Sequence, residues 1–223
     1  MLNVNNNPIP CPATKVHQCD YSGRYYCSDC HKKTQYAVPA RILYNWDFRP
    51  RPLALQSHEV LTFLSEREYI NVERINPRLF DSVSSLAELR EFRERIILYK
   101  AHFVQCSRAM KEGLFLRLRP RQHFIDSSKL YTLRDLQDVN NGSLLPEIQQ
   151  VVVDYEKHYT GCSTCSNLKF ACAGCAAPPL ISPFSDMYSM AQCSQCHGVL
   201  HRACFNRSSE CPYCSAGLVD IAD

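Results

Sequence analysis

The chain has 223 residues, of which 45% are apolar and only seven are glycine, so its composition excludes a disordered tail and predicts one or two folded domains. The formal net charge is +3, but that value counts all 14 cysteines as neutral. Because four thiolates around one divalent ion carry about −2, metal sites would make the folded protein mildly acidic, and we predict no nucleic-acid partner.

The N-terminus indicates the compartment in which the cysteines are expected. Residues 1–7 contain neither a basic patch nor an apolar run, so we expect no signal peptide and no membrane-spanning segment. In a reducing cytoplasm, thiols at this density are expected to hold metal ions rather than to form disulfides.

Residues 1–34 are predicted to form an N-terminal zinc-binding segment. A Cys-x-x-Cys pair lies within it, with a histidine directly after the pair and another cysteine upstream. A gap of two residues lets one tight turn point both sulfurs at the same ion. Cys11 is a weaker candidate because it lies between two prolines, which favour extended backbone. The predicted ligands are Cys19, Cys27, Cys30 and His31.

Residues 35–160 are predicted to form a helical region that is almost free of cysteine. Asn76-Pro77 would start a long amphipathic helix that reaches Lys111, because apolar residues then recur at steps of three and four: Phe80, Val83, Leu86, Leu89, Phe92, Ile96, Tyr99 and Phe103. Thr132 with Asp135 resembles a capping box at the start of a short helix, and another helix is predicted over 143–158.

Several residues of this region have ordinary structural interpretations. Trp46, the only tryptophan, is interpreted as a core residue. Cys106 and His158 are considered as additional metal ligands, but a structural role is preferred for each. We interpret a basic run as a solvated loop; it consists of Arg117, Arg119 and Arg121.

Residues 161–216 are predicted to form a cysteine-rich zinc-binding module. Nine cysteines and one histidine form five pairs, each with two residues between its members: Cys162/Cys165, Cys172/Cys175, Cys193/Cys196, His201/Cys204 and Cys211/Cys214. Each pair has the spacing of half a tetrahedral zinc site. Two sites would use four pairs and leave one pair over.

The spacing leaves two pairing schemes open. A sequential scheme would join the first two pairs into one knuckle. An interleaved cross-brace, as in FYVE, PHD and RING-like modules, would join Cys172/Cys175 to His201/Cys204 and Cys193/Cys196 to Cys211/Cys214. Sites of this kind leave little room for a reactive open position, and the sequence has no P-loop or nucleophile elbow. We therefore predict structural metal and no enzymatic activity.

Three stretches of sequence carry a resemblance. They are residues 19–31 (CDYSGRYYCSDCH), residues 39–48 (PARILYNWDF) and the ten-ligand block with Pro183-Phe184 inside it. Together they resemble the Rubicon homology domain over about Cys19 to Cys214, so the whole chain is expected to be one such domain. Within the family, the segment Arg121-Gln122-His123-Phe124 is most similar to that of a small member.

The resemblance implies a mainly α fold with small zinc-stabilised β and loop modules, arranged as a helical superhelix around four zinc clusters. It also implies zinc at all ten C-terminal ligands. Relatives carry a further Cys-x-x-Cys pair upstream of the position of Cys19, where this chain offers only Cys11. We therefore expect three or four structural zinc ions: either Cys11 partly substitutes for the missing pair, or one N-terminal site is incomplete, as in a shortened isoform.

The resemblance further implies partners and a location. It predicts a non-catalytic adaptor that binds a GTP-bound late-endosomal Rab GTPase and PLEKHM-type lysosomal adaptors, with roles in lysosome positioning, endosome–lysosome trafficking and autophagy. The chain would be cytoplasmic and would reach late endosomes and lysosomes peripherally, through its partners. Two alternatives are a RING-like ubiquitin ligase, because of the cross-brace order, and a C1-like lipid-binding module, because the tail of that module resembles Cys196, His201, Cys204 and Cys211.

Overall fold

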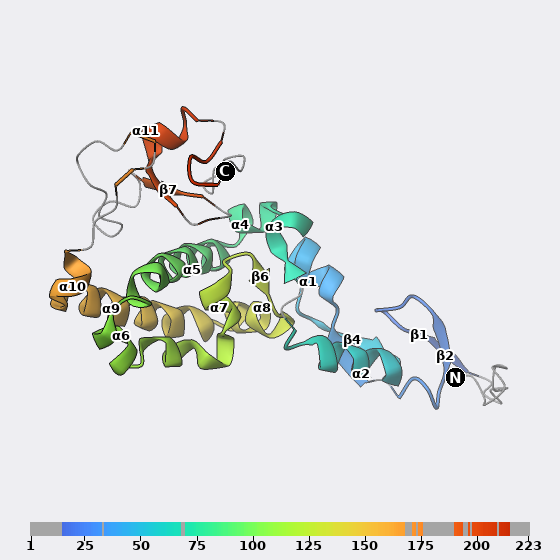
Figure 1. Cartoon of the computed structure of the whole chain (residues 1–223). Helices are drawn as coiled ribbons and strands as arrows, with labels where there is room; N and C mark the ends of the chain where they lie inside the picture. Colours follow the sequence, from blue (N-terminus) through green and yellow to red (C-terminus); the bar gives the residue numbers. More distant parts are fainter. Residues whose placement is uncertain are drawn as a thin grey trace, which may run out of the picture. The chain divides into compact units, whose positions relative to one another are not determined.

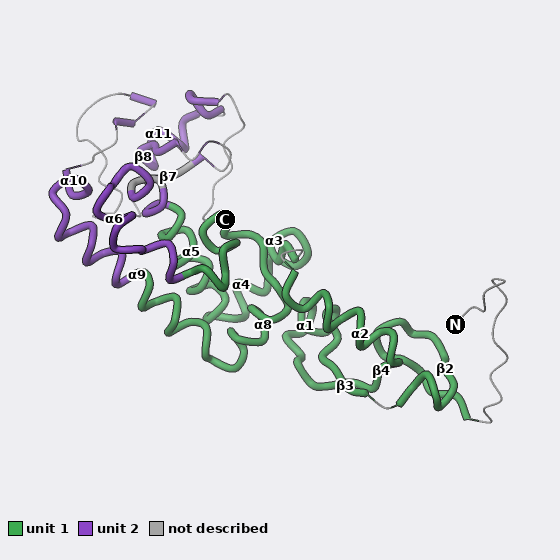
Figure 2. Tube along the Cα trace, turned by 60° about the horizontal axis from the view of Figure 1, so that its bottom comes forward, with its two compact units in different colours: residues 1–97, 118–152 green, residues 98–117, 153–223 purple. Residues whose placement is uncertain are grey.

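The computed structural model describes residues 15–32, 34–67, 70–167, 171–172, 174–175, 190–193, 196, 198–208 and 210–214. The chain divides into two compact units, each built from two stretches of sequence (Figure 2). Unit 1 contains residues 1–97 and 118–152, and unit 2 contains residues 98–117 and 153–223. The helical region 35–160 thus contributes to both units, and the predicted mainly α fold with small β modules is confirmed.

Unit 1 begins with two small antiparallel sheets. β1 (Val16–Gln18) pairs with β2 (Tyr25–Cys27), and β3 (Thr34–Ala37) pairs with β4 (Pro50–Leu53). In Figure 1 the β1–β2 hairpin lies at the N-terminal end of the unit, beyond α2 (Leu55–Leu64). A buried cluster holds these elements together; it consists of Cys19, Val38, Leu53, Ala54 and Leu61.

α1 (Pro39–Asn45) connects β3 to β4 and carries the start of the 39–48 motif. Pro39 lies in the first turn of the helix, where no backbone N–H donor is needed. Trp46 follows the helix in the left-handed conformation, with φ 53°. Its indole is half-buried and lies edge-on to Phe48, with ring centroids 5.0 Å apart. Trp46 therefore lies at the edge of the core rather than fully inside it.

The chain forms several helices where one long helix was predicted. α3 (Val72–Ile75) ends just before the predicted start at Asn76. α4 (Arg78–Ser82) and α5 (Ser84–Phe103) then follow one another, and α6 (Ser107–Lys111) begins after a further break. The prediction of one uninterrupted helix is wrong because Val83 adopts extended backbone and Cys106 caps α6, its sulfur accepting from Ala109 N at 3.4 Å. The apolar stripe is nevertheless buried at Phe80, Leu86, Leu89, Ile96, Tyr99 and Phe103.

The second stretch of unit 1 begins with short elements. η1 (Leu114–Arg121) is a 3-10 helix that crosses from unit 2 into unit 1, and α7 (His123–Asp126) follows it. β6 (Leu130–Tyr131) pairs with β5 (Ile70–Asn71). Arg93 of α5 fixes these elements, because its buried guanidinium lies over the rings of Phe124 and Tyr131 and donates to Leu130 O at 2.8 Å.

A buried polar network fixes the start of α8 (Leu133–Asn140). The predicted capping box of Thr132 and Asp135 is confirmed. Asp135, with a side chain only 1% exposed, pairs with Arg121 and accepts from His123 Nε2 at 2.7 Å. Arg121 also donates to Asp138 Oδ2 at 2.8 Å. The interpretation of the basic run as a solvated loop is therefore wrong for Arg121.

These contacts also set the protonation of the buried carboxyl. Burial raises the pKa of Asp135, but the hydrogen bonds from His123 and from the backbone of Thr132 outweigh burial and bring the pKa below its ordinary value. The folded chain therefore holds Asp135 as a paired carboxylate.

Unit 2 contains the ends of two long helices and a small C-terminal module. α9 (Leu144–Gly161) confirms the helix predicted over 143–158 and extends beyond it, and α10 (Ser163–Ser166) follows. The module contains β7 (Met190–Gln192), which pairs with β8 (Val199–His201), and α11 (Arg202–Phe205). No helix of the described part of the chain combines the length and apolar character needed to cross a membrane.

Two apolar clusters hold unit 2 together. Aromatic rings from α5, η1 and α9 pack on one another with centroids 5.3–6.5 Å apart: Tyr99, Phe103, Phe115, Tyr155 and Tyr159. The second cluster packs the C-terminal module against Leu98 of α5; its other members are Cys172, Met190, Ala191, Val199, Leu200 and Phe205. Both clusters include or border candidate metal ligands.

Candidate metal centres

Cysteine and histidine side chains come together at three places, all within unit 2. In each group the four ligand atoms lie within 4.8 Å of one another. All cysteines of the described residues are free thiols. The groups are the Cys106 site (Cys106, His158, Cys162 and Cys165), the His201 site (Cys172, Cys175, His201 and Cys204) and the Cys193 site (Cys193, Cys196, Cys211 and Cys214).

The distances between ligand atoms fit a tetrahedral ion. Zinc–sulfur bonds of about 2.3 Å and zinc–nitrogen bonds of about 2.0 Å require about 3.8 Å between two sulfurs and about 3.5 Å between sulfur and nitrogen. The Sγ–Sγ distances are 3.7 Å for Cys106–Cys162, 3.7 Å for Cys193–Cys214 and 3.6 Å for Cys196–Cys211. The Sγ–N distances are 3.5 Å for Cys106–His158, 3.4 Å for Cys165–His158 and 3.4 Å for Cys175–His201. The donor set and its spacing therefore fit zinc.

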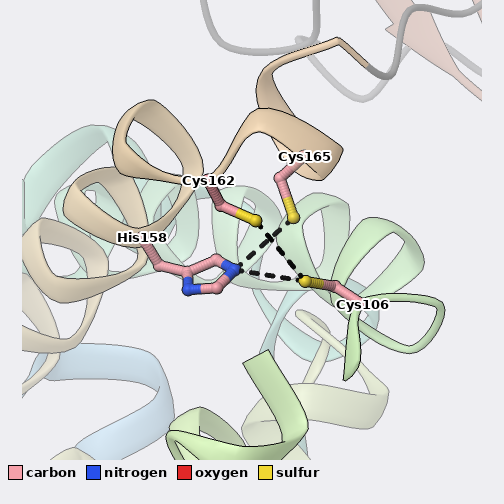
Figure 3. Close-up of side chains that lie close together, drawn as sticks. All are labelled: Cys106, His158, Cys162 and Cys165. Atoms are coloured by element: carbon pink, nitrogen blue, oxygen red, sulfur yellow. Dashed lines mark hydrogen bonds between the residues drawn. The ribbon is translucent and has the colours of Figure 1, made fainter. Parts of the chain in front are cut away.

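The Cys106 site is assembled from three helices (Figure 3). Cys106 caps α6, His158 lies in the last turn of α9, Cys162 is the N-cap of α10 and Cys165 lies within α10. All four side chains are buried. The pair left over in the sequence pattern thus meets Cys106 and His158, which makes these two residues candidate ligands as well as structural ones. His158 and Cys162 are four residues apart, a helical spacing that could have indicated the site.

The other two sites interleave in the C-terminal module. The pair Cys193/Cys196 follows β7, whereas His201 and Cys204 come from the end of β8 and from α11. The structure therefore has the cross-brace and not the sequential scheme. A side chain in place of Gly198 would require Tyr213 to shift, because a Cβ atom there would lie 2.3 Å from Cδ2 of Tyr213.

The thiols at these sites are unequal. Backbone donation within the Cys-x-x-Cys turn, from Cys165, lowers the pKa of Cys162 to about 7. Burial raises the pKa of Cys172, but backbone donors, His201 N at 3.3 Å first among them, outweigh burial and lower it to about 7. Burial, with the neighbouring thiols, raises the pKa of Cys165, Cys196 and Cys204, because crowded thiolates repel one another. A divalent ion would relieve this repulsion.

The four N-terminal candidates do not form a group of three or more ligands within the described residues. Cys19 is buried, and its thiol lies 3.4 Å from Ser57 Oγ. A hydrogen bond with Cys27 raises the pKa of Cys30. Both ring nitrogens of His31 are buried without a hydrogen-bond partner among the residues described, a costly arrangement that a ligand would relieve. The N-terminal site stays a prediction, and Cys11 and Pro183-Phe184 lie outside the described residues.

A cavity of about 360 Å³ lies beside the Cys106 site, with Arg108, Glu112, Arg117, Asp154, Lys157 and His158 in its lining. Arg117 is paired with Asp154, and Arg108 is paired with Glu112. Most of the charge in the lining is therefore balanced within the cavity itself. Glu112 and Arg108 were not singled out from the sequence.

The fold and these centres define a mainly helical domain in which groups of four cysteine and histidine side chains come together from short helices, turns and a hairpin. The family model described as the Rubicon Homology Domain matches residues 17–217, and the chain belongs to this family.

Three curated relatives are similar to most of the chain. Pleckstrin homology domain-containing family M member 3 from Homo sapiens is 34% identical over 200 residues, which cover 90% of this chain and 26% of the relative. The Differentially expressed in FDCP 8 homologs from Drosophila melanogaster and Caenorhabditis elegans are 32% and 31% identical over 216 and 204 residues, covering 96% and 88% of this chain and 42% of each relative. The chain thus spans less than half the length of these curated relatives. The latter two agree with the resemblance to a small family member.

Proposed function

We propose that this chain is a zinc-stabilised, non-catalytic adaptor domain that binds a GTP-bound Rab GTPase of late endosomes. The match of the family over residues 17–217 carries this proposal, and the similarity to pleckstrin homology domain-containing family M member 3 supports it. Through this GTPase and PLEKHM-type adaptors, the chain would be recruited from the cytoplasm to late endosomes and lysosomes. There it would act in lysosome positioning, endosome–lysosome trafficking and autophagy.

Zinc has a structural role in this proposal. Each of the three groups supplies four protein ligands, so a bound ion would have no open position for water or a substrate. Each Cys₃His site would carry about −1 and the Cys₄ site about −2, which would bring the formal charge from +3 to about −1. This charge supports a protein partner rather than a nucleic acid.

The GTPase is recognised in this proposal by its ordered switch loops, which differ between the GTP-bound and GDP-bound forms. We expect the zinc-loaded chain to bind a late-endosomal Rab loaded with a non-hydrolysable GTP analogue and to bind the GDP-loaded form at least about tenfold more weakly, a difference of about 1.4 kcal/mol. Isothermal titration calorimetry with both nucleotide states measures this difference.

An early-endosomal Rab in the same nucleotide state serves as the specificity control. Equal affinity for the GTP-loaded and GDP-loaded late-endosomal Rab, or no binding to either by a fully zinc-loaded chain, would contradict the proposed function. Zinc-dependent ubiquitin chain formation by the purified chain with a conjugating enzyme would instead support the RING-like alternative.

A further inference from the structure

One turn of helix carries both a metal ligand and a carboxylate that contacts another ligand of the same site. Cys106 is the N-cap of α6, and Glu112 is its C-cap. Glu112 Oε2 lies 2.6 Å from Nδ1 of His158. The other ring nitrogen, Nε2, lies 3.5 Å from the sulfur of Cys106 and 3.4 Å from that of Cys165. The two ring nitrogens of His158 therefore have different partners, as Figure 3 shows for the nitrogen that faces the sulfurs.

This arrangement selects one form of the imidazole. A neutral imidazole has one N–H donor and one nitrogen with a free lone pair. A carboxylate is an acceptor, so Glu112 favours the form of His158 that carries its proton on Nδ1. Nε2 is then left with its lone pair directed at the three sulfurs, which is the form that a metal ion requires.

Arg108 extends the contact to the neighbouring backbone. Its Nε donates to Glu112 Oε1 at 2.8 Å, so each of the two carboxylate oxygens has its own partner. Its Nη1 donates to the carbonyl oxygen of Gly161 at 3.0 Å. Gly161 is the last residue of α9 and directly precedes the ligand Cys162. Arg108 thus connects the carboxylate to the backbone that presents a third ligand.

Stability alone does not explain this pair. The side chains of Arg108 and Glu112 are 59% and 37% exposed, and exposed ion pairs contribute little to folding because solvent screens them. Their partners, in contrast, are a buried metal-ligand candidate and the end of the helix that carries it. Orientation of the ligands accounts for both contacts.

We propose that Glu112 and Arg108 are positioning residues of the Cys106 site: Glu112 fixes His158 for ligation through Nε2, and Arg108 fixes Glu112 together with the end of α9. This inference rests on the structural zinc of the proposed function. It assigns the exposed turn of α6 a role in metal affinity at one of the three sites and not at the other two.

The first test measures zinc affinity at each site in the full chain by native mass spectrometry during competition with a graded chelator. We expect E112A to weaken binding of one zinc ion by about 10- to 100-fold, the usual effect of removing a group that orients a metal ligand, and to leave two ions unchanged. E112Q keeps an oxygen that accepts from Nδ1 and should retain most of the affinity. Lys111, which is exposed on the same helix, provides the control K111A.

The second test reads the imidazole directly. Long-range proton–nitrogen NMR correlations of the zinc-loaded chain should show His158 bound through Nε2 and protonated on Nδ1. This measurement on the unchanged chain keeps the inference testable if E112A fails to fold. Ligation through Nδ1 overturns the inference.

A zinc affinity of E112A within about twofold of K111A also overturns it, because removal of an orienting group is expected to change metal affinity by about tenfold or more. In that case, if native mass spectrometry finds three zinc ions in the unchanged chain, the proposed structural role of zinc is still supported. No zinc in the unchanged chain would remove that role and this inference together.

Discussion

Removal of zinc by a strong chelator is expected to unfold unit 2. Structural zinc sites in small peptides contribute about 10 to 16 kcal/mol at pH 7, as much as the whole stability of a typical domain, about 5 to 15 kcal/mol. The C-terminal module has only a small apolar cluster to replace that contribution, and one of its members, Cys172, is itself a candidate ligand. Native mass spectrometry should count three zinc ions lost from the three groups, and a fourth if the N-terminal site is complete.

Hydrogen exchange shows where the unfolding occurs. Amide protection should be lost over β7, β8 and α11 of unit 2. Trp46, the only tryptophan, lies in unit 1, so its fluorescence monitors that unit separately. The same chelator saturated with zinc beforehand is the control for non-specific effects.

At a single site, C165S should remove one ion, and S166A at the neighbouring position should remove none. Protected amides in the C-terminal module after complete loss of zinc would contradict the structural role.

Replacement of Arg121 by alanine is expected to destabilise unit 1 by about 3 to 5 kcal/mol, the cost of leaving a buried charge without its partner. Asp135 is almost fully buried and would keep only His123 and the backbone of Thr132 as partners. Urea unfolding in zinc-saturated buffer, followed by the fluorescence of Trp46, measures the change.

The neighbouring residue Arg119 provides a matched control because it is exposed and belongs to the same basic run. R119A should change the free energy of unfolding by no more than about 0.5 kcal/mol, as is usual for surface positions. Equal effects of R121A and R119A would show that the network around Asp135 does not stabilise the unit. A loss in R121A alone would show that the two arginines differ through burial and not through charge.

The comparison of these two arginines illustrates a limit of sequence reasoning. Arg117, Arg119 and Arg121 alternate along the chain and look alike as a solvated basic run. Only the packing of η1 against α8 brings Arg121 to Asp135 and Asp138. The capping box of Thr132 and Asp135 was predictable because both partners lie within one helical turn.

Helix breaks show the same limit. The apolar period from Phe80 to Phe103 continues across Val83, where the backbone is extended, because a break of one residue hardly disturbs a pattern of threes and fours. The stripe therefore predicted which side chains are buried but not where the helix ends. Cys106, which serves both as N-cap and as candidate ligand, was considered as a ligand from the sequence, but no local spacing connected it to a partner.

The sequence by itself determined the five half-sites, because a gap of two residues fixes two ligands on one turn. Local patterns of apolar residues and of motifs likewise indicated the mainly helical middle and the family. Tertiary structure alone decided which halves meet. The cross-brace depends on how the β7–β8 hairpin folds back, and the remaining pair meets a histidine four residues before it and a cysteine 56 residues away in sequence. A metal site needs four atoms at one point in space, and chain spacing constrains only those that share a turn.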